Sequence, residues 1–382
     1  MLLKNAKIYT MEGPVLEQGY ILIEGTDILA VGEGDYGPYS GEVLDLAGKC
    51  VVPGFVDAHC HLGMWEDALG FEGDDGNEDT DPVTPHLRAI DAINPQDPCF
   101  ADAYRAGVTT VVTGPGSANV IGGQFAAINT YGRCIDEMIL KAPAAMKFAF
   151  GENPKSVYNA KNQPPVTRMG MAAEIREMLF KAKRYGEDLA NYQKDPEAFD
   201  RPEFDMKCES LLPVLDGSLL VKVHAHRADD MFTAMRIARE FGLSITLEHA
   251  TEAHLISGYL AGMKLNLGPL LTDRSKPELK NASSETICML KRAGIDAALT
   301  TDHPETPIEY LPLCAAVAVK HGLTIEEALA AITIIPARNV GIDGMVGSIK
   351  PGKHADLVVL DGPPLAMQTM AQLVFLNGKR IV

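Results

Sequence analysis

The sequence predicts an α/β fold, in which a (β/α)8 barrel (TIM barrel) carries a small β-sandwich built from both termini. Between Pro53 and about Val340, short β-rich runs alternate with longer helical patterns. The residues before and after that stretch form only short strand-like runs. We therefore expect residues 1–52 and 341–382 to form the two parts of the sandwich, and residues 53–340 to form the barrel.

The terminal segments share one pattern. Residues 1–52 contain short apolar runs such as GYILIEGTDILAVG, which are interrupted by Gly, Pro and Asp. MVGSIKPGKHADLVVLDG and QLVFLNGKRIV repeat this pattern near the other end of the chain. Such runs are typical of small antiparallel strands joined by turns.

The central stretch contains eight candidate strands. Eight βα units close a barrel, and the active sites of such barrels lie at the C-terminal ends of the strands. We therefore expect polar residues with chemistry at those ends. The candidate strands are residues 54–60, 107–114, 124–130, 145–152, 219–226, 244–250, 263–268 and 296–302.

Two long segments within the barrel lack a regular pattern. They are residues 65–98, after the first strand, and residues 184–213, after the fourth. Long insertions at the active face of a barrel usually form lids or substrate walls. Elsewhere the helix signals are ordinary, and the capping box of Thr324 and Glu327 predicts the start of a helix in TIEEALAAITI.

Composition excludes several classes of function. Of the 382 residues, 46% are hydrophobic and 22% are charged, and the formal net charge is −17. This negative charge repels phosphate backbones and anionic lipids, and no run of about 18 apolar residues occurs. We therefore expect a small-molecule substrate and neither a nucleic-acid nor a membrane partner. Seven cysteines without paired spacing favour a reducing compartment, so we expect a cytoplasmic protein.

The motif PGFVDAHCHLG places His59 and His61 two residues apart at the end of the first barrel strand. Alternate residues of a strand face the same side, so both imidazoles point in one direction. Imidazole nitrogen is a preferred zinc ligand. A lone histidine is more often a packed core residue, but this pair favours a metal site.

Other potential ligands stand at the ends of later strands. His224 and His226 end the fifth strand, His249 the sixth and Asp302 the eighth. Each residue alone could be structural. Because all of these strand ends meet at one face of a barrel, together they predict a single metal centre.

With these motifs and the tail AITIIPARNVGIDGMVGSIKPGKHADLVVLD, the chain resembles the amidohydrolase superfamily, and within it the imidazolonepropionase-like and prolidase-like branch. The resemblance covers essentially the whole chain. It implies a distorted (β/α)8 barrel with one or two divalent ions per chain, usually Zn2+, that activate a hydrolytic water. It also implies a homo-oligomer, since members of the superfamily often form dimers or larger assemblies.

The resemblance also implies roles for individual residues. It makes His59 and His61 ligands of a first metal, and His224 and His249 ligands of a second or shared site. Asp302 becomes both a metal ligand and the catalytic base. A carboxylate beside a metal-bound water takes up its proton and then delivers that proton to the leaving nitrogen.

The ligand from the fourth strand is open. Binuclear members of the superfamily commonly supply a carboxylated lysine there, and some members supply a glutamate. Here AMKFAFGENPK offers Lys147 and Glu152. We prefer Glu152 as the metal ligand, because it stands at the predicted end of the strand, whereas Lys147 lies well before it. If Glu152 only caps a turn, we expect a mononuclear site.

Three further residues are candidate substrate contacts: His226, Arg227 and Arg274. Each follows a predicted strand at the active face of the barrel. Each could equally be a solvated or structural residue.

The main functional hypothesis is hydrolysis of a C–N amide bond, cyclic or linear, in a small molecule such as an imidazolone, an N-acyl amino acid or a proline dipeptide. The same machinery would also hydrolyse a lactone or a phosphoester. A second hypothesis is deamination of a heterocycle, but deaminase relatives carry His-x-x-Glu after strand five, and here Arg227 takes that position. A third is a non-catalytic scaffold, although such proteins have typically lost the ligands that this chain retains.

Overall fold

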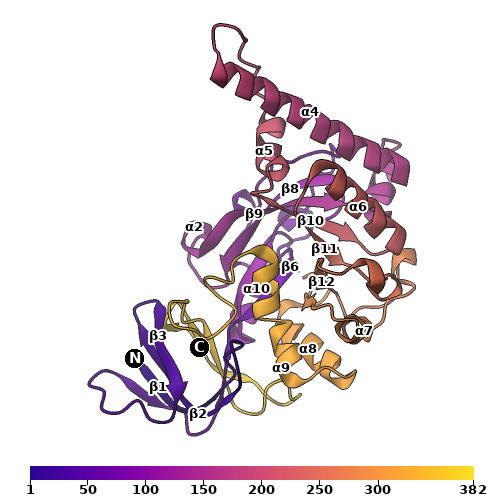
Figure 1. Ribbon diagram of the computed structural model, residues 1–382. Helices are drawn as coiled ribbons and strands as arrows, with labels where there is room; N and C mark the ends of the chain where they lie inside the picture. Colours follow the sequence, from indigo (N-terminus) through magenta and orange to yellow (C-terminus); the bar gives the residue numbers. More distant parts are fainter.

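The computed structural model describes residues 1–382 as two eight-stranded sheets with helices around them (Figure 1). One sheet curves into a nearly closed barrel, and strands from both ends of the chain build the other sheet. The expected α/β class, with a barrel and a smaller β unit made from both termini, is confirmed.

The barrel sheet follows the chain from one edge to the other, in the order β13-β12-β11-β10-β9-β8-β7-β6. Its two edges meet beyond the last strand, where Asp302 N–H donates to the carbonyl of His59 over 3.1 Å and His61 N–H donates to the carbonyl of His303 over 2.9 Å. The strands are β6 (Phe55–Cys60), β7 (Val108–Thr113), β8 (Ile121–Asn129), β9 (Ile139–Ala149), β10 (Leu220–Ala225), β11 (Ile245–His249), β12 (Lys264–Leu267) and β13 (Ala298–Leu299).

The third strand departs from the expected series of parallel βα units. β8 pairs antiparallel with both β7 and β9, whereas the other neighbouring strands are parallel. The reason lies in the connection, because only residues 114–120 join β7 to β8. A parallel crossover needs a dozen or more residues, so this short link produces a hairpin.

Helices pack around the barrel and on one another. α10 contacts β6 and β12, α6 contacts β10, and α8 contacts β6 and β13. The predicted capping box at the start of α9 is present. The helices are α1 (Pro98–Arg105), α2 (Ile135–Met138), α3 (Glu152–Ala160), α4 (Arg168–Lys194), α5 (Met206–Leu215), α6 (Ala228–Phe241), α7 (Thr286–Arg292), α8 (Leu311–Lys320), α9 (Ile325–Ala330) and α10 (Ile334–Val340).

The prediction that residues 184–213 are irregular is wrong. Most of them belong to α4 and α5, two helices that contact each other, and α4 also contacts α6 (Figure 1). Residues 65–98, by contrast, contain only the short 3-10 helices η1 (Gly70–Gly73) and η2 (Ala89–Asp91) before α1 begins.

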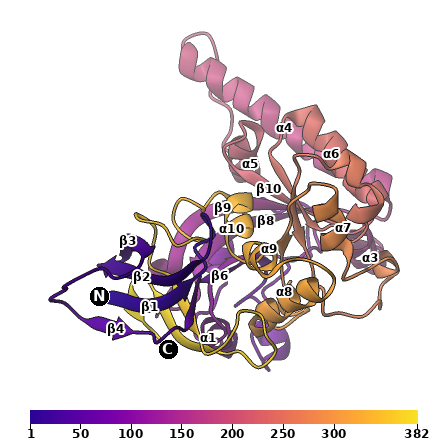
Figure 2. The ribbon, with the colours of Figure 1, turned by 60° about the horizontal axis from the view of Figure 1, so that its bottom comes forward.

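The second sheet joins the two ends of the chain, and Figure 2 shows the termini on the same side of the molecule. β5 pairs antiparallel with β14, and β1 pairs with β2, β4 and β5, so the strands form one mixed sheet. Val51 packs in the small core of this sheet, whereas Val52 packs against the barrel core. The strands are β1 (Leu2–Ile8), β2 (Leu16–Glu24), β3 (Asp27–Glu33), β4 (Val43–Asp45), β5 (Cys50–Pro53), β14 (Leu357–Leu360), β15 (Ala371–Leu376) and β16 (Lys379–Arg380).

None of the helices combines the length and the apolar character that a membrane span requires. All seven cysteines are free thiols.

Candidate metal centre

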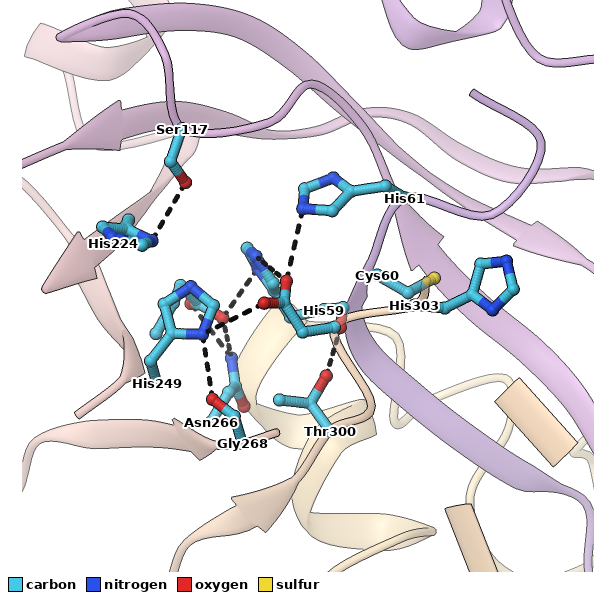
Figure 3. A network of polar contacts seen from close by, with 12 residues as sticks. His59, Cys60, His61, Ser117, His224, His249, Asn266, Gly268, Thr300 and His303 are labelled. Atoms are coloured by element: carbon cyan, nitrogen blue, oxygen red, sulfur yellow. Dashed lines mark hydrogen bonds and ion pairs between the residues drawn. The ribbon is translucent and has the colours of Figure 1, made fainter. Parts of the chain in front are cut away.

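His59, His61 and Asp302 come together where the two edges of the barrel sheet meet. Asp302 Oδ1 lies 3.3 Å from His61 Nε2 and 3.6 Å from His59 Nε2. All three residues are buried, and one ligand atom of each lies within 4.8 Å of the others. Figure 3 shows His59, His61 and His249 turned toward a common centre. We call His59, His61 and Asp302 the first group.

Buried Asp57 holds the first group in place. It accepts hydrogen bonds from His59 N–H over 3.0 Å and from Thr301 N–H over 2.9 Å, and the hydroxyl of Thr301 donates over 2.5 Å. These bonds tie β6 to the segment that carries Asp302. Asp302 itself has φ 55°, a left-handed conformation that non-glycine residues rarely adopt and that is found preferentially at functional sites.

His224, His226 and His249 form a second group at the ends of β10 and β11. One nitrogen of each lies within 4.8 Å of the others, and all three side chains are buried. His249 also links the groups, because its Nδ1 lies 3.7 Å from Asp302 Oδ2. The predicted ligands His224 and His249 are therefore close together, and His226, expected to contact substrate, lies in the same group.

Four of the five histidines share one orientation, in which Nδ1 forms a hydrogen bond to the protein and Nε2 does not. His61 Nδ1 donates to the Gly114 carbonyl over 2.6 Å, and His249 Nδ1 donates to the Gly268 carbonyl over 2.9 Å. A carbonyl only accepts, so Nδ1 carries the proton and Nε2 keeps a free lone pair. This is the arrangement found in metal-binding histidines.

The same orientation holds in the second group, where His224 Nδ1 lies 2.9 Å from Ser117 Oγ and His226 Nδ1 lies 2.7 Å from Thr251 Oγ1.

Burial keeps these imidazoles neutral. It lowers the pKa of His59, His224 and His249 well below the ordinary value, and the neighbouring cations and histidines lower it further. For His226, burial followed by His224 lowers the pKa to about 3. Neutral imidazole is the form that binds a metal.

The residues fit a divalent ion. His224 Nε2, His249 Nε2 and Asp302 Oδ1 are buried and form no hydrogen bond. Two tetrahedral ligands about 2.1 Å from one ion are about 3.4 Å apart, close to the 3.3 and 3.6 Å between the ligand atoms of the first group.

The structure does not bring Glu152 to either group, and our preference for it over Lys147 needs correction. β9 ends at Ala149, Gly151 adopts φ 91°, and Glu152 is the first residue of α3. Its carboxylate accepts the backbone N–H of Glu278 over 3.3 Å. Lys147 is fully buried instead, and its long side chain carries Nζ to 3.2 Å from His59 Nε2.

Sequence reasoning also missed Glu248, a fully buried residue that precedes His249 on β11. Its Oε2 lies 3.0 Å from His59 Nδ1 and 2.9 Å from Lys222 Nζ. Asn266 Nδ2 donates to the same carboxylate over 3.0 Å. Glu248 therefore faces Nδ1 of His59, which is the position that carboxylates commonly take behind metal-binding histidines. A glutamate within the apolar run ITLEHA was the available signal.

The pair of Glu248 and Lys222 leads to a stability prediction. Glu248→Gln leaves the Lys222 ammonium buried without a counter-charge, and Lys222→Met leaves the carboxylate unpaired. We expect each variant to lose about 3 to 5 kcal/mol of unfolding free energy. In urea denaturation, the double variant should lose clearly less than the sum of the two, because it buries no unpaired charge. A double variant whose loss of unfolding free energy equals the sum of the two single losses would contradict the pairing of Glu248 with Lys222.

Arg227 and Arg274, both predicted substrate contacts, take different positions. Arg227 pairs with Asp229 over 2.9 Å at the start of α6 and lines neither cavity of the site. Arg274 lines a cavity of about 480 Å³ that adjoins His249, and its guanidinium donates to the Ala282 carbonyl over 2.7 Å. A second cavity, of about 490 Å³, contains His61 among its lining residues.

Comparisons with known proteins place the chain in a family. The model of the amidohydrolase family matches residues 239–382. The structure of an amidohydrolase from Thermotoga maritima is 43% identical, superposes with a TM-score of 0.96, and matches 100% of this chain and 99% of its own. The chain belongs to the amidohydrolase family. The family resemblance read from the sequence is thus confirmed, and with it the enzyme class, a hydrolase of C–N bonds.

Two curated relatives extend this picture of the amidohydrolase. The amidohydrolase tasK of Hapsidospora irregularis is 30% identical over 89% of this chain, which spans only 37% of that longer protein. An imidazolonepropionase of Porphyromonas gingivalis is 29% identical over 94% of this chain and 85% of its own length. The family is metal-dependent, and the first and second groups supply suitable ligands.

Proposed function

We propose that this amidohydrolase cleaves a C–N amide bond, cyclic or linear, in a small molecule, with a divalent ion held by His59, His61 and Asp302. One observation carries the proposal: at the joined ends of the barrel sheet, the ligand atoms of these buried side chains converge within 4.8 Å of one another. His224 and His249 supply further ligands beside them.

The bound ion and Asp302 have different roles in the proposed reaction. A divalent ion bound there would lower the pKa of a coordinated water to about 7 and polarise the scissile carbonyl. We assign Asp302 as the base, because its carboxylate lies between the two groups, with Oδ1 toward His61 and Oδ2 toward His249. Asp302 takes the proton of the attacking water and then donates it to the leaving nitrogen.

We further propose Lys147, in carboxylated form, as the ligand from the fourth strand. Its position 3.2 Å from His59 supports this role, and so does the burial that lowers its pKa to about 8. A lower pKa raises the fraction of neutral amine, which is the form that combines with carbon dioxide.

Deamination has less support than hydrolysis. The glutamate that deaminase relatives carry after strand five is replaced by Arg227, which pairs with Asp229 away from the cavities. The structure of an adenosine deaminase from Xanthomonas campestris is only 18% identical, so its similarity shows the fold and not the reaction.

The cavity beside His61 offers one cation, a lysine, to a substrate that carries a carboxylate, and it is also lined by the exposed Glu305. Lys276 lines it, partly buried, together with Ser117, Asn77 and His226. N-acyl amino acids, dipeptides and imidazolonepropionate each combine an amide with a carboxylate. We propose this class of substrate, with Lys276 as the partner of the carboxylate.

A substrate screen with the Zn2+-loaded protein tests both parts. We expect turnover of at least one carboxylate-bearing amide, abolished by a chelator and restored by added ion. Lys276→Met should raise KM about 10- to 100-fold, with a smaller change in kcat, because it removes a charged hydrogen bond. Exposed Lys280→Met serves as the control. An unchanged KM in the Lys276 variant would exclude this recognition.

The same proposal includes the identity and number of the ions, the location of the protein and its assembly. We propose Zn2+ as the ion, two ions per chain, a cytoplasmic location and a homo-oligomeric state. The division into residues 1–52, 53–340 and 341–382 is likewise proposed.

A further inference from the structure

The loop between β12 and α7 places one carboxylate, that of Glu278, against the second group. Glu278 belongs to the 3-10 helix η5 (Pro277–Leu279) and is only 2% exposed. Its Oε1 lies 3.6 Å from His226 Nε2 and 3.8 Å from His224 Nε2. Both distances exceed a hydrogen bond, and Oε1 forms no hydrogen bond elsewhere.

An unpaired buried carboxylate is costly, and the protein offers it no cation. Its nearest titratable neighbours are His224 and His226, and no lysine or arginine forms an ion pair with it. Such a group favours a bound cation, because only an ion pair offsets the loss of hydration.

The spacing suits a metal ion between these side chains. The distances of 3.6 and 3.8 Å are close to the roughly 3.4 Å that separates two tetrahedral ligands of one ion. Ser117 and Thr251 hold the Nδ1 atoms of the two histidines, so both Nε2 atoms remain open toward Glu278.

The rest of the Glu278 side chain is fixed. Its Oε2 accepts the backbone N–H of Glu152 over 3.1 Å, and Glu152 accepts the N–H of Glu278 in return. At Gly151, an added Cβ would lie 3.1 Å from Glu278 Oε2. The close approach of backbone and carboxylate therefore depends on glycine at this position, and it leaves only Oε1 free.

We propose that Glu278 is a ligand of a second divalent ion, together with His224 and His226. The inference rests on the proposed function, since it takes the centre to bind divalent ions. It adds a ligand that comes from a loop rather than from a barrel strand. Ion binding would therefore also hold residues 269–285 against the mouth of the barrel.

Ion titration of the full chain, freed of metal by a chelator, tests this proposal. Calorimetry with Zn2+ should give two ions for the wild type, and Glu278→Gln should bind one of them about 100-fold or more weakly. Glu152→Gln is the matched control, because its amide oxygen still accepts the N–H of Glu278, and we expect it to bind as the wild type does. Substituted Co2+ should change its visible spectrum only in the Glu278 variant.

Limited trypsin cleavage is a second readout, since Arg274 and Lys280 lie in the same loop. Added Zn2+ should slow cleavage there in the wild type and in Glu152→Gln, but not in Glu278→Gln. If the Glu278 variant does not fold, cleavage of the wild type still tests the proposal. Cleavage of this loop at the same rate with and without Zn2+ would overturn it.

Equal ion number and affinity in wild type and Glu278→Gln would also overturn it and leave the hydrolase intact. A wild type that binds a single ion would likewise overturn the role of Glu278 and leave the hydrolase intact. A wild type that binds no ion would remove the proposed function as well.

Discussion

Asp302→Asn should lower kcat about 10²- to 10⁴-fold while the protein stays folded and keeps much of its metal. Asparagine has the same shape and retains an oxygen near His61 Nε2, but it cannot accept the proton of the attacking water. Steady-state kinetics on the best substrate from the screen, with circular dichroism and metal analysis of the same samples, measures all three quantities.

Asp273→Asn is a matched control, because this exposed carboxylate lines the adjoining cavity without contact to either group. We expect its kcat to match the wild type. An Asp302 variant with wild-type turnover would refute the role of Asp302 as base, whereas one that has lost its fold would show that Asp302 is mainly structural.

Lys147→Met should remove one of about two ions and reduce turnover by at least about 100-fold. Methionine has similar length and no amine, so it forms no carbamate, and the space beside His59 is filled without a ligand. Metal analysis counts the ions. Carbon NMR after incubation with labelled bicarbonate should detect a carbamate in the wild type and none in the variant.

The companion variant Glu152→Gln separates the two candidates from the fourth strand. It should keep both ions, because Glu152 bonds to the backbone of Glu278 rather than to the centre. Loss of an ion in Glu152→Gln, with full occupancy in Lys147→Met, would reverse the assignment.

The sequence predicted the strand-end residues because they follow a rule that does not depend on detailed geometry. His59, His61, His224, His249 and Asp302 stand at the ends of barrel strands, and the closure of any such barrel brings those ends together. Their identity as donors of nitrogen and oxygen ligands then pointed to a metal before any distance was known.

The fourth strand shows where this reasoning fails. We expected this strand to end at Glu152, but it ends three residues earlier, at Ala149. Because of this difference, we preferred Glu152 to Lys147 as the metal ligand. Positive φ at Gly151 ends the strand early, and the length of the Lys147 side chain compensates for its earlier position. Neither effect follows from the alternation of residues along a strand.

Long connections were the other source of error. α4 is largely polar between Arg184 and Lys194, because that part of the helix buries only Tyr185. A helix that buries so little shows no apolar stripe in its sequence. Glu278 was missed for a related reason, since the path of its loop depends on the reciprocal bonds with Glu152.

The divalent-ion content of the purified full chain tests the central claim most directly. Elemental analysis should find about two ions per chain in the wild type, and a marked loss in the His59→Ala/His61→Ala double variant. A wild type without any divalent ion after purification and exposure to Zn2+, or a double variant with undiminished content, would contradict a metal centre at these residues.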